Sequence, residues 1–104
     1  MYFRNLILTA AAETLQAPPV AKPPDPKPVI SQEMRGDIFM ARKMYREAID
    51  TYKQAGDGAV FQNKIGIAYH QLIELNTARR YYEKAIKSNP QYAEAINNLG
   101  TVYY

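Results

Sequence analysis

The chain has 104 residues, of which 47% are hydrophobic and 22% charged, and its formal net charge is +3. This length allows one domain at most, with a composition that is ordinary for a soluble fold. The charge is too small to indicate a nucleic-acid partner by itself. Because cysteine is absent, disulfide scaffolds, thiolate metal sites, cysteine nucleophiles and a lipid-anchoring cysteine are all excluded.

The N-terminal segment, residues 1–17, has the order of a secretory signal peptide. A single positive charge, Arg4, precedes a short apolar run that ends at Ala12, and prolines follow. Glu13 and Leu15 fit the approach to a cleavage site poorly, so a disordered leader is the alternative. The prolines slightly favour an exported (periplasmic or extracytoplasmic) location over a cytoplasmic one. We expect no transmembrane span, since one needs roughly 20 apolar residues.

A proline-rich stretch occupies residues 18–29. Six of the seven prolines lie between Pro18 and Pro28, interleaved with charged residues. Such a sequence favours solvated polyproline II over a packed core. We therefore expect a disordered tether here, in front of a folded domain over residues 30–104.

The spacing of apolar residues predicts five helices in this domain. Their expected ranges are 31–42, 46–54, 60–72, 76–87 and 92 to the end of the chain. Ser31 and Asn76 are suited to cap two of these helices, because their side chains can accept from the free amides of the first turn. Apolar residues recur at three- and four-residue intervals in the third helix and should face the core: Phe61, Ile65, Ala68, Tyr69 and Leu72.

Two copies of one pattern recur at a fixed spacing along the chain. The first copy consists of Asn63, Ile65, Gly66 and Tyr69, and the second of Asn97, Leu99, Gly100 and Tyr103. Small residues, an aromatic residue and a closing proline lie between them: Ala78, Tyr82, Ala85 and Pro90. Small residues permit the close approach of antiparallel helices, and Tyr69 and Tyr82 fill the space beside them. A fixed period of about 34 residues indicates stacked repeats.

A weaker copy precedes the full one at a slightly shorter spacing and consists of Gly36, Phe39, Ala48, Tyr52 and Ala55. The offset to the full copy is uniform through Ala55, so the four missing residues fall after it, where Gly56-Asp57-Gly58 stands. Glycine supplies the left-handed backbone that a helix C-cap needs. We therefore expect the second helix of this short repeat to end about one turn early.

This pattern resembles the signature of the tetratricopeptide repeat family, on the residues Ile65, Gly66, Tyr69, Ala78, Tyr82 and Pro90. The resemblance divides the domain into a short first repeat (30–58), a full repeat (59–92) and the first helix of a truncated repeat (93–104). It departs at the tryptophan column, which holds Gln62 and Ile96. It implies an all-α, right-handed α-solenoid of antiparallel helix pairs, about two and a half repeats long.

In this family the first helix of each pair lines a concave groove. The resemblance therefore implies a partner-binding groove lined by Asp37, Met40, Asn63, Ile67, His70, Glu94, Asn97 and Thr101. Amide side chains both donate to and accept from an extended peptide, and Met40 and Ile67 offer apolar contact. For any one of these residues, a solvated helix position is an equally good account.

One subset of the family binds the carboxylate end of chaperone tails through basic and amide residues at set columns. The corresponding residues here are Glu33, Asp37, Lys64, Glu94 and Asn98. Only Lys64 is basic, so this ligand class is disfavoured and an acidic C-terminal peptide should be repelled.

Catalysis has one candidate residue. His70 is the only histidine and precedes Glu74 by one turn, but no nucleophile, phosphate loop or metal-ligand spacing accompanies it. We therefore expect no enzyme activity, cofactor, metal or small-molecule substrate. Nucleic acid is a weak alternative, suggested by nine tyrosines and by basic residues of the fourth predicted helix: Arg79, Arg80, Lys84 and Lys87.

The function predicted from these observations is a noncatalytic scaffold that binds a peptide or helix of a partner protein. The alternative is a structural adaptor in a larger exported or envelope-associated assembly. Self-association through the C-terminal helix is also expected, because Val102, Tyr103 and Tyr104 lack the second helix that normally covers them.

Overall fold

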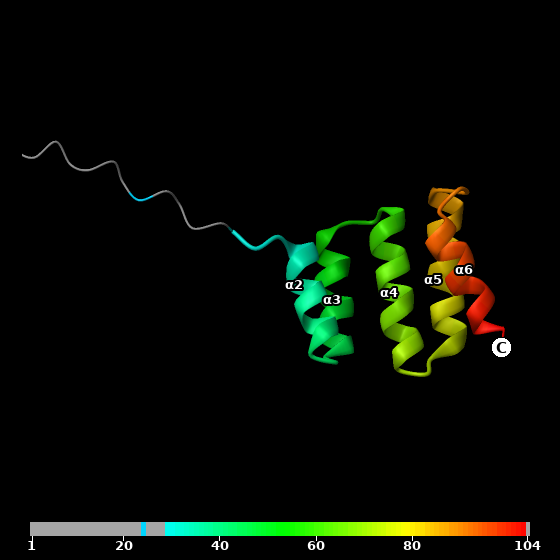
Figure 1. Cartoon of the computed structure of the whole chain (residues 1–104), viewed down its shortest axis with the longest axis horizontal. Helices are drawn as coiled ribbons and strands as arrows, with labels where there is room; N and C mark the ends of the chain where they lie inside the picture. The colour runs from blue at the N-terminus through cyan, green and yellow to red at the C-terminus, as the bar shows by residue number, and fades with distance from the viewer. Residues whose placement is uncertain (1–23, 25–28, 104) are drawn as a thin grey trace, which may run out of the picture.

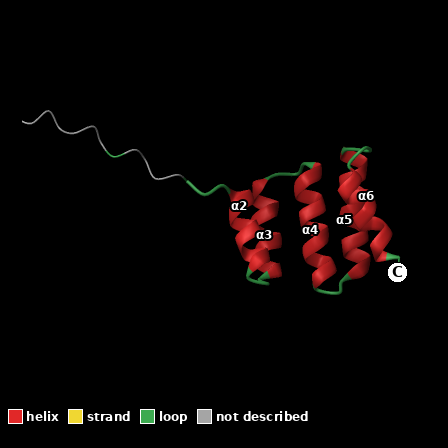
Figure 2. Cartoon of the chain, in the orientation of Figure 1, coloured by secondary structure: helices red, strands yellow, loops and turns green. Residues whose placement is uncertain are grey.

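A computed structural model of the protein describes residue 24 and residues 29–103. The expected leader, most of the expected tether and Tyr104 lie outside these residues. The described helices are α2 (Gln32–Ala41), α3 (Tyr45–Ala55), α4 (Ala59–Gln71), α5 (Leu75–Ser88) and α6 (Ala93–Val102). In the described part of the chain all regular secondary structure is helical (Figure 2). The helix boundaries expected for 31–87 differ from the observed ones by one residue at each end.

Each helix packs against the next one along the chain, and α4 also contacts α6 (Figure 1). This sequential arrangement of helix pairs confirms the predicted all-α repeat fold. Among the described residues, no helix is long and apolar enough to cross a membrane.

Tyrosines seated on glycines hold each helix pair together. Tyr52 of α3 packs on Gly36 of α2, and Tyr82 of α5 packs on Gly66 of α4; each tyrosine is 1% exposed. A Cβ atom added to Gly66 would lie 2.6 Å from the Tyr82 ring, and one at Gly36 would collide with Tyr52. The predicted close approach at Gly66 is therefore confirmed.

The core stripe predicted for α4 is also confirmed. Ile65 and Ala68 are buried in a cluster with Ala48, Ile49 and Tyr52 of α3. Phe61, Tyr69 and Leu72 are partly buried and pack against that cluster.

The short first repeat ends as predicted. Helix α3 stops at Ala55, whereas α5 continues three residues beyond the equivalent Ala85, to Ser88. The predicted backbone of the cap is wrong, however, because Gly56 has φ 156° and ψ −179°. This conformation is extended with positive φ, which glycine alone adopts readily, and it differs from the left-handed helical cap.

Left-handed caps occur instead at two residues that are not glycine. Lys43 (φ 61°) follows α2, and Ile73 (φ 59°) follows α4. After α4, the Ile73 amide donates to the His70 carbonyl and the Glu74 amide donates to the Tyr69 carbonyl, each at 3.0 Å. These two bonds form a Schellman motif, and the same motif follows α2.

Of the two predicted helix N-caps, one is confirmed and the other is wrong. The Ser31 hydroxyl accepts from the Met34 amide at 3.1 Å, which confirms it as the N-cap of α2. The prediction for Asn76 is wrong, because α5 begins at Leu75 with Glu74 as its N-cap. The Schellman motif brings the chain directly into α5, so this helix starts before Asn76 can cap it.

Candidate functional site

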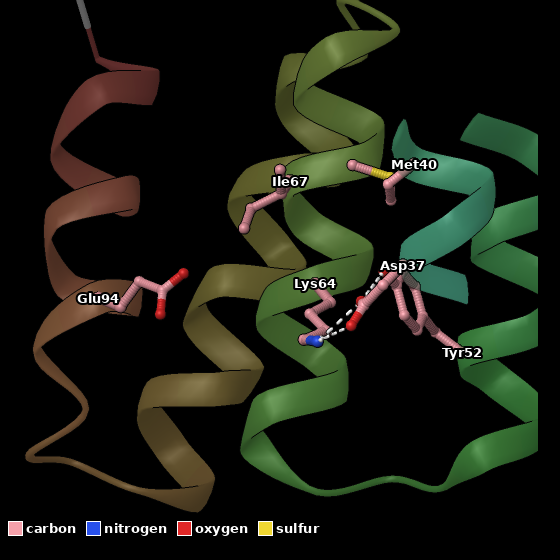
Figure 3. Close-up of a pocket in the computed structure, with 6 residues that line it drawn as sticks. All are labelled: Asp37, Met40, Tyr52, Lys64, Ile67 and Glu94. Atoms are coloured by element: carbon pink, nitrogen blue, oxygen red, sulfur yellow. Dashed lines mark hydrogen bonds and ion pairs between the residues drawn. The ribbon is translucent and has the colours of Figure 1, made fainter. Parts of the chain in front are cut away.

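A cavity of about 240 Å³ opens on the side of the molecule where α2, α4 and α6 present side chains (Figure 3). Its lining residues come from these three helices and from α3: Asp37, Met40, Tyr52, Lys64, Ile67 and Glu94. We call this surface the groove. The groove therefore spans α4 and the two helices that flank it on this side, α2 and α6.

An ion cluster ties α2 to α4 in the floor of the groove. The Lys64 ammonium lies 2.8 and 3.0 Å from the two Asp37 carboxylate oxygens and 3.0 Å from Glu33 Oε1. The Tyr52 hydroxyl, from α3, donates to Asp37 Oδ1 at 2.6 Å. Four side chains from three helices therefore hold one another in place.

The ionisation of this cluster follows from its contacts. Burial alone would raise the pKa of Asp37, but the hydrogen bonds from Lys64 and Tyr52 outweigh it and hold that pKa below its usual value. Burial alone would lower the pKa of Lys64, but Asp37 and Glu33 outweigh it and raise that pKa. Burial and then Asp37 raise the pKa of Tyr52. At neutral pH Asp37 is therefore a carboxylate paired with the Lys64 ammonium ion, and Tyr52 is neutral.

The rest of the groove wall combines apolar and acidic side chains. Met40 extends from α2 and Ile67 from α4 into the space between the helices, and the Glu94 carboxylate projects from α6 toward α4 (Figure 3). Burial, together with the negative charge of Glu94, raises the pKa of Tyr82 to about 12. The negative charge of Glu94 therefore acts on Tyr82, which is buried between α4 and α5.

A family model described as the tetratricopeptide repeat matches residues 59–92, which form the helix pair α4 and α5. Residues 59–92 are a tetratricopeptide repeat. The segment agrees with the full repeat expected from the spacing of Gly66, Tyr82 and Pro90.

The chain is similar to two proteins that share one description. It is 32% identical over 77 residues to the uncharacterized protein ycf37 of Guillardia theta, covering 65% of this chain and 43% of that protein. It is 37% identical over 41 residues to the uncharacterized protein ycf37 of Pyropia yezoensis, covering 39% of this chain and 23% of that protein. The chain therefore spans less than half the length of these relatives.

Four of the eight residues expected from the tetratricopeptide resemblance line the groove cavity: Asp37, Met40, Ile67 and Glu94. Asn63 does not, because it is 1% exposed and its Oδ1 accepts from Asn98 Nδ2 at 3.0 Å. Its expected place on the open surface is therefore wrong: it ties α4 to α6 from a buried position.

The other three expected residues lie apart from the cavity lining. His70 is half-buried, with Nδ1 3.2 Å from the Tyr82 hydroxyl. Glu74, the residue considered as its orienting partner, instead pairs with Arg46 at 3.2 Å. Asn97 and Thr101 are exposed on α6, where the Thr101 hydroxyl donates to the Asn98 carbonyl at 2.6 Å.

Two lining residues, Tyr52 and Lys64, are absent from the eight predicted groove residues, although the comparison with the carboxylate-binding subset places Lys64 at a groove column. The repeat pattern assigns Tyr52 to packing, and its ring does pack on Gly36, but its hydroxyl also reaches the groove floor. The signal for Lys64 is present in the sequence. Glu33 and Asp37 are one turn apart on the same face of α2, and a lysine in the neighbouring first helix can bridge them.

Within the described residues, no group of three or more histidine, aspartate and glutamate side chains is placed to hold a metal ion. In the groove, the Lys64 ammonium lies between the carboxylates of Glu33 and Asp37.

Proposed function

We propose that the chain is a noncatalytic protein–protein interaction module that binds a peptide segment of a partner protein in the groove. The observation that carries this proposal is the cavity lined by side chains of α2, α4 and α6. Its apolar residues, Met40 and Ile67, are flanked by the charged residues Asp37, Lys64 and Glu94. An apolar contact for anchoring and charged groups for orientation are what a groove needs to select a peptide.

The size of the cavity favours a side chain of a longer ligand over a small molecule. Its volume of about 240 Å³ lies below the roughly 300–1,000 Å³ of typical small-molecule pockets. A peptide that inserts one anchor side chain and continues along α4 uses the whole groove. Repeat arrays present such extended concave surfaces because each repeat contacts only its neighbours.

A selection from random peptides of about twelve residues tests this function. Peptides selected on the unmodified chain should lose binding when Ile67→Ser removes the apolar contact in the groove. Ile73→Ser is the matched control, because Ile73 is 75% exposed in the loop between α4 and α5. Thermal melts verify that both variants fold. Selected peptides that bind both variants equally well would place the binding surface outside the groove.

Self-association through α6 is a second proposal, and a separate observation favours it. Gly36 and Gly66 each seat a tyrosine, whereas no side chain of the residues that the structure describes lies within 4 Å of a Cβ atom built on Gly100. Tyr103, the C-cap of the same helix, is 65% exposed. Tyr103 of one copy of the chain can pack on Gly100 of a second copy, and Tyr103 of the second copy on Gly100 of the first. Such a reciprocal contact is what a two-fold dimer requires. Sedimentation equilibrium on the chain and on Tyr103→Ala tests this, and a monomer at all concentrations contradicts it.

A further inference from the structure

The charge of the groove is opposite in sign to that of the chain. Three carboxylates, Glu33, Asp37 and Glu94, lie in or beside the groove with one ammonium, that of Lys64. The chain as a whole carries a formal charge of +3. The negative charge is therefore gathered at the groove and is no consequence of overall composition.

Lys64 is not available to an acidic ligand. An ammonium group has three donors, and Lys64 has three acceptor oxygens within 3.0 Å, two from Asp37 and one from Glu33. These contacts raise the pKa of Lys64, so the ammonium stays charged. A ligand carboxylate must displace one of them, so the single basic residue of the groove offers little to an acidic peptide.

Glu94 is placed to act on a ligand directly. Its side chain makes no ion pair or hydrogen bond with another described residue, and it projects from α6 toward α4 (Figure 3). The opposite wall carries the Asp37–Lys64 cluster, and Ile67 lies between the two. A cation bound at Glu94 is therefore next to an apolar contact, and Asp37 lies in the lining of the same cavity.

We propose that the groove binds a basic segment, in which an apolar side chain contacts Met40 and Ile67 and a neighbouring lysine or arginine pairs with Glu94. This inference rests on the proposed function and names the chemistry of its ligand. The ion pair is exposed to solvent, so it acts on specificity and on the association rate more than on total affinity. Binding should weaken as salt is raised, because solvent-exposed charges are screened over about 8–10 Å at physiological ionic strength.

Three fluorescently labelled peptides test the sign of the charge. They share the same leucines and the same length, and the residues between the leucines are all lysine, all glutamine or all glutamate. Fluorescence anisotropy should give the smallest dissociation constant for the lysine peptide and the largest for the glutamate peptide. Glu94→Lys should weaken the lysine peptide by about fivefold to tenfold and tighten the glutamate peptide.

Glu83→Lys is the matched control, because it makes the same change of net charge at an exposed position on α5. It should leave the order and size of the three constants nearly unchanged. Equal effects of Glu94→Lys and Glu83→Lys, no binding of the lysine peptide, or equal binding of the glutamate peptide would overturn the inference. The random-peptide selection separates this failure from that of the proposed function. Selected peptides that are not basic, yet lose binding to Ile67→Ser, overturn the charge inference alone.

Discussion

Asn98 Nδ2 donates a hydrogen bond to Asn63 Oδ1 at 3.0 Å, and this contact is the repeat equivalent of the ion pair between Lys64 and Glu33. Lys64 precedes Asn98 by one full repeat period, and Glu33 precedes Asn63 by the shorter spacing of the first repeat, so both pairs join the same two columns. One pattern thus ties α4 back to α2 with charges and α6 back to α4 with amides. The amide pair is the more buried, since Asn63 is 1% exposed.

Asn63→Ala should lower the free energy of unfolding by about 1–3 kcal/mol, because it removes a buried hydrogen bond and leaves the Asn98 amide without its acceptor. Asn97→Ala is the control, since Asn97 is exposed on α6 beside Asn98. That variant should change stability by less than about 0.5 kcal/mol. Urea unfolding followed by circular dichroism measures both. Equal stabilities would show that the amide pair does not join the repeats.

The equivalent glycines Gly66 and Gly100 should differ in their tolerance of alanine. Gly66→Ala brings a methyl group against the Tyr82 ring, at 2.6 Å, and should destabilise the chain by about 1–3 kcal/mol. Gly100→Ala meets no side chain of another described helix within 4 Å and replaces a poor helix former, so it should be neutral or stabilise by up to about 1 kcal/mol. Thermal unfolding of the two variants at one low concentration measures the difference. A loss of stability in Gly100→Ala equal to that in Gly66→Ala would indicate that a side chain already packs on Gly100.

The same Gly100→Ala variant bears on self-association. If Tyr103 of a second copy seats on Gly100, the added methyl group should weaken the dimer while the monomer keeps its stability.

The features that can be predicted from the sequence are those recorded by spacing along one helix or one repeat. The helix ranges, the core stripe around Ile65 and the seat of Tyr82 on Gly66 all depend on such spacing, and the structure confirms them. The family resemblance places Lys64 at a groove column, but spacing alone does not establish its ion pairs with Asp37 and Glu33, because they depend on where α4 stands against α2. Asn63 is misplaced for the same reason, since its partner Asn98 on α6 lies 35 positions further along the chain.

The backbone conformation of the loops after α2 and α4 is not predicted from the sequence, for a different reason. A left-handed cap is predicted from glycine or asparagine, but Lys43 and Ile73 occupy these positions. Conversely, glycine does follow α3 at position 56, where the backbone is extended. Residue type alone does not separate the two conformations, because packing of the next helix imposes the left-handed turn at unfavourable residues.

Ile73→Gly should stabilise the chain by about 1 kcal/mol. The left-handed conformation costs an L-residue roughly 1–2 kcal/mol and is least favourable for a β-branched side chain. Little burial is lost in exchange, because Ile73 is 75% exposed. Lys43→Gly, at the equivalent turn after α2, should give a smaller gain, since lysine is not β-branched. Chemical denaturation ranks the two variants, and a loss of stability in Ile73→Gly would contradict this account of the turn.

The ion cluster of the groove predicts how stability depends on pH. The pKa of Asp37 in the folded chain lies below its ordinary value of 3.8, so the folded state binds fewer protons than the unfolded state in the acid range. Its contribution to stability is therefore present above about pH 4 and is lost as the pH falls through the folded pKa. Asp37→Asn should be less stable than the unmodified chain near neutral pH, and this difference should shrink on acidification.

Unfolding by urea at a series of pH values between about 7 and 2 measures this difference. Asp50→Asn, at an exposed position of α3, makes the same chemical change as a control. A deficit of Asp37→Asn that stays constant across the series would assign its cost to lost packing. A deficit that vanishes in acid, with no such trend for Asp50→Asn, assigns it to the carboxylate that holds Lys64 and Tyr52 in the groove floor.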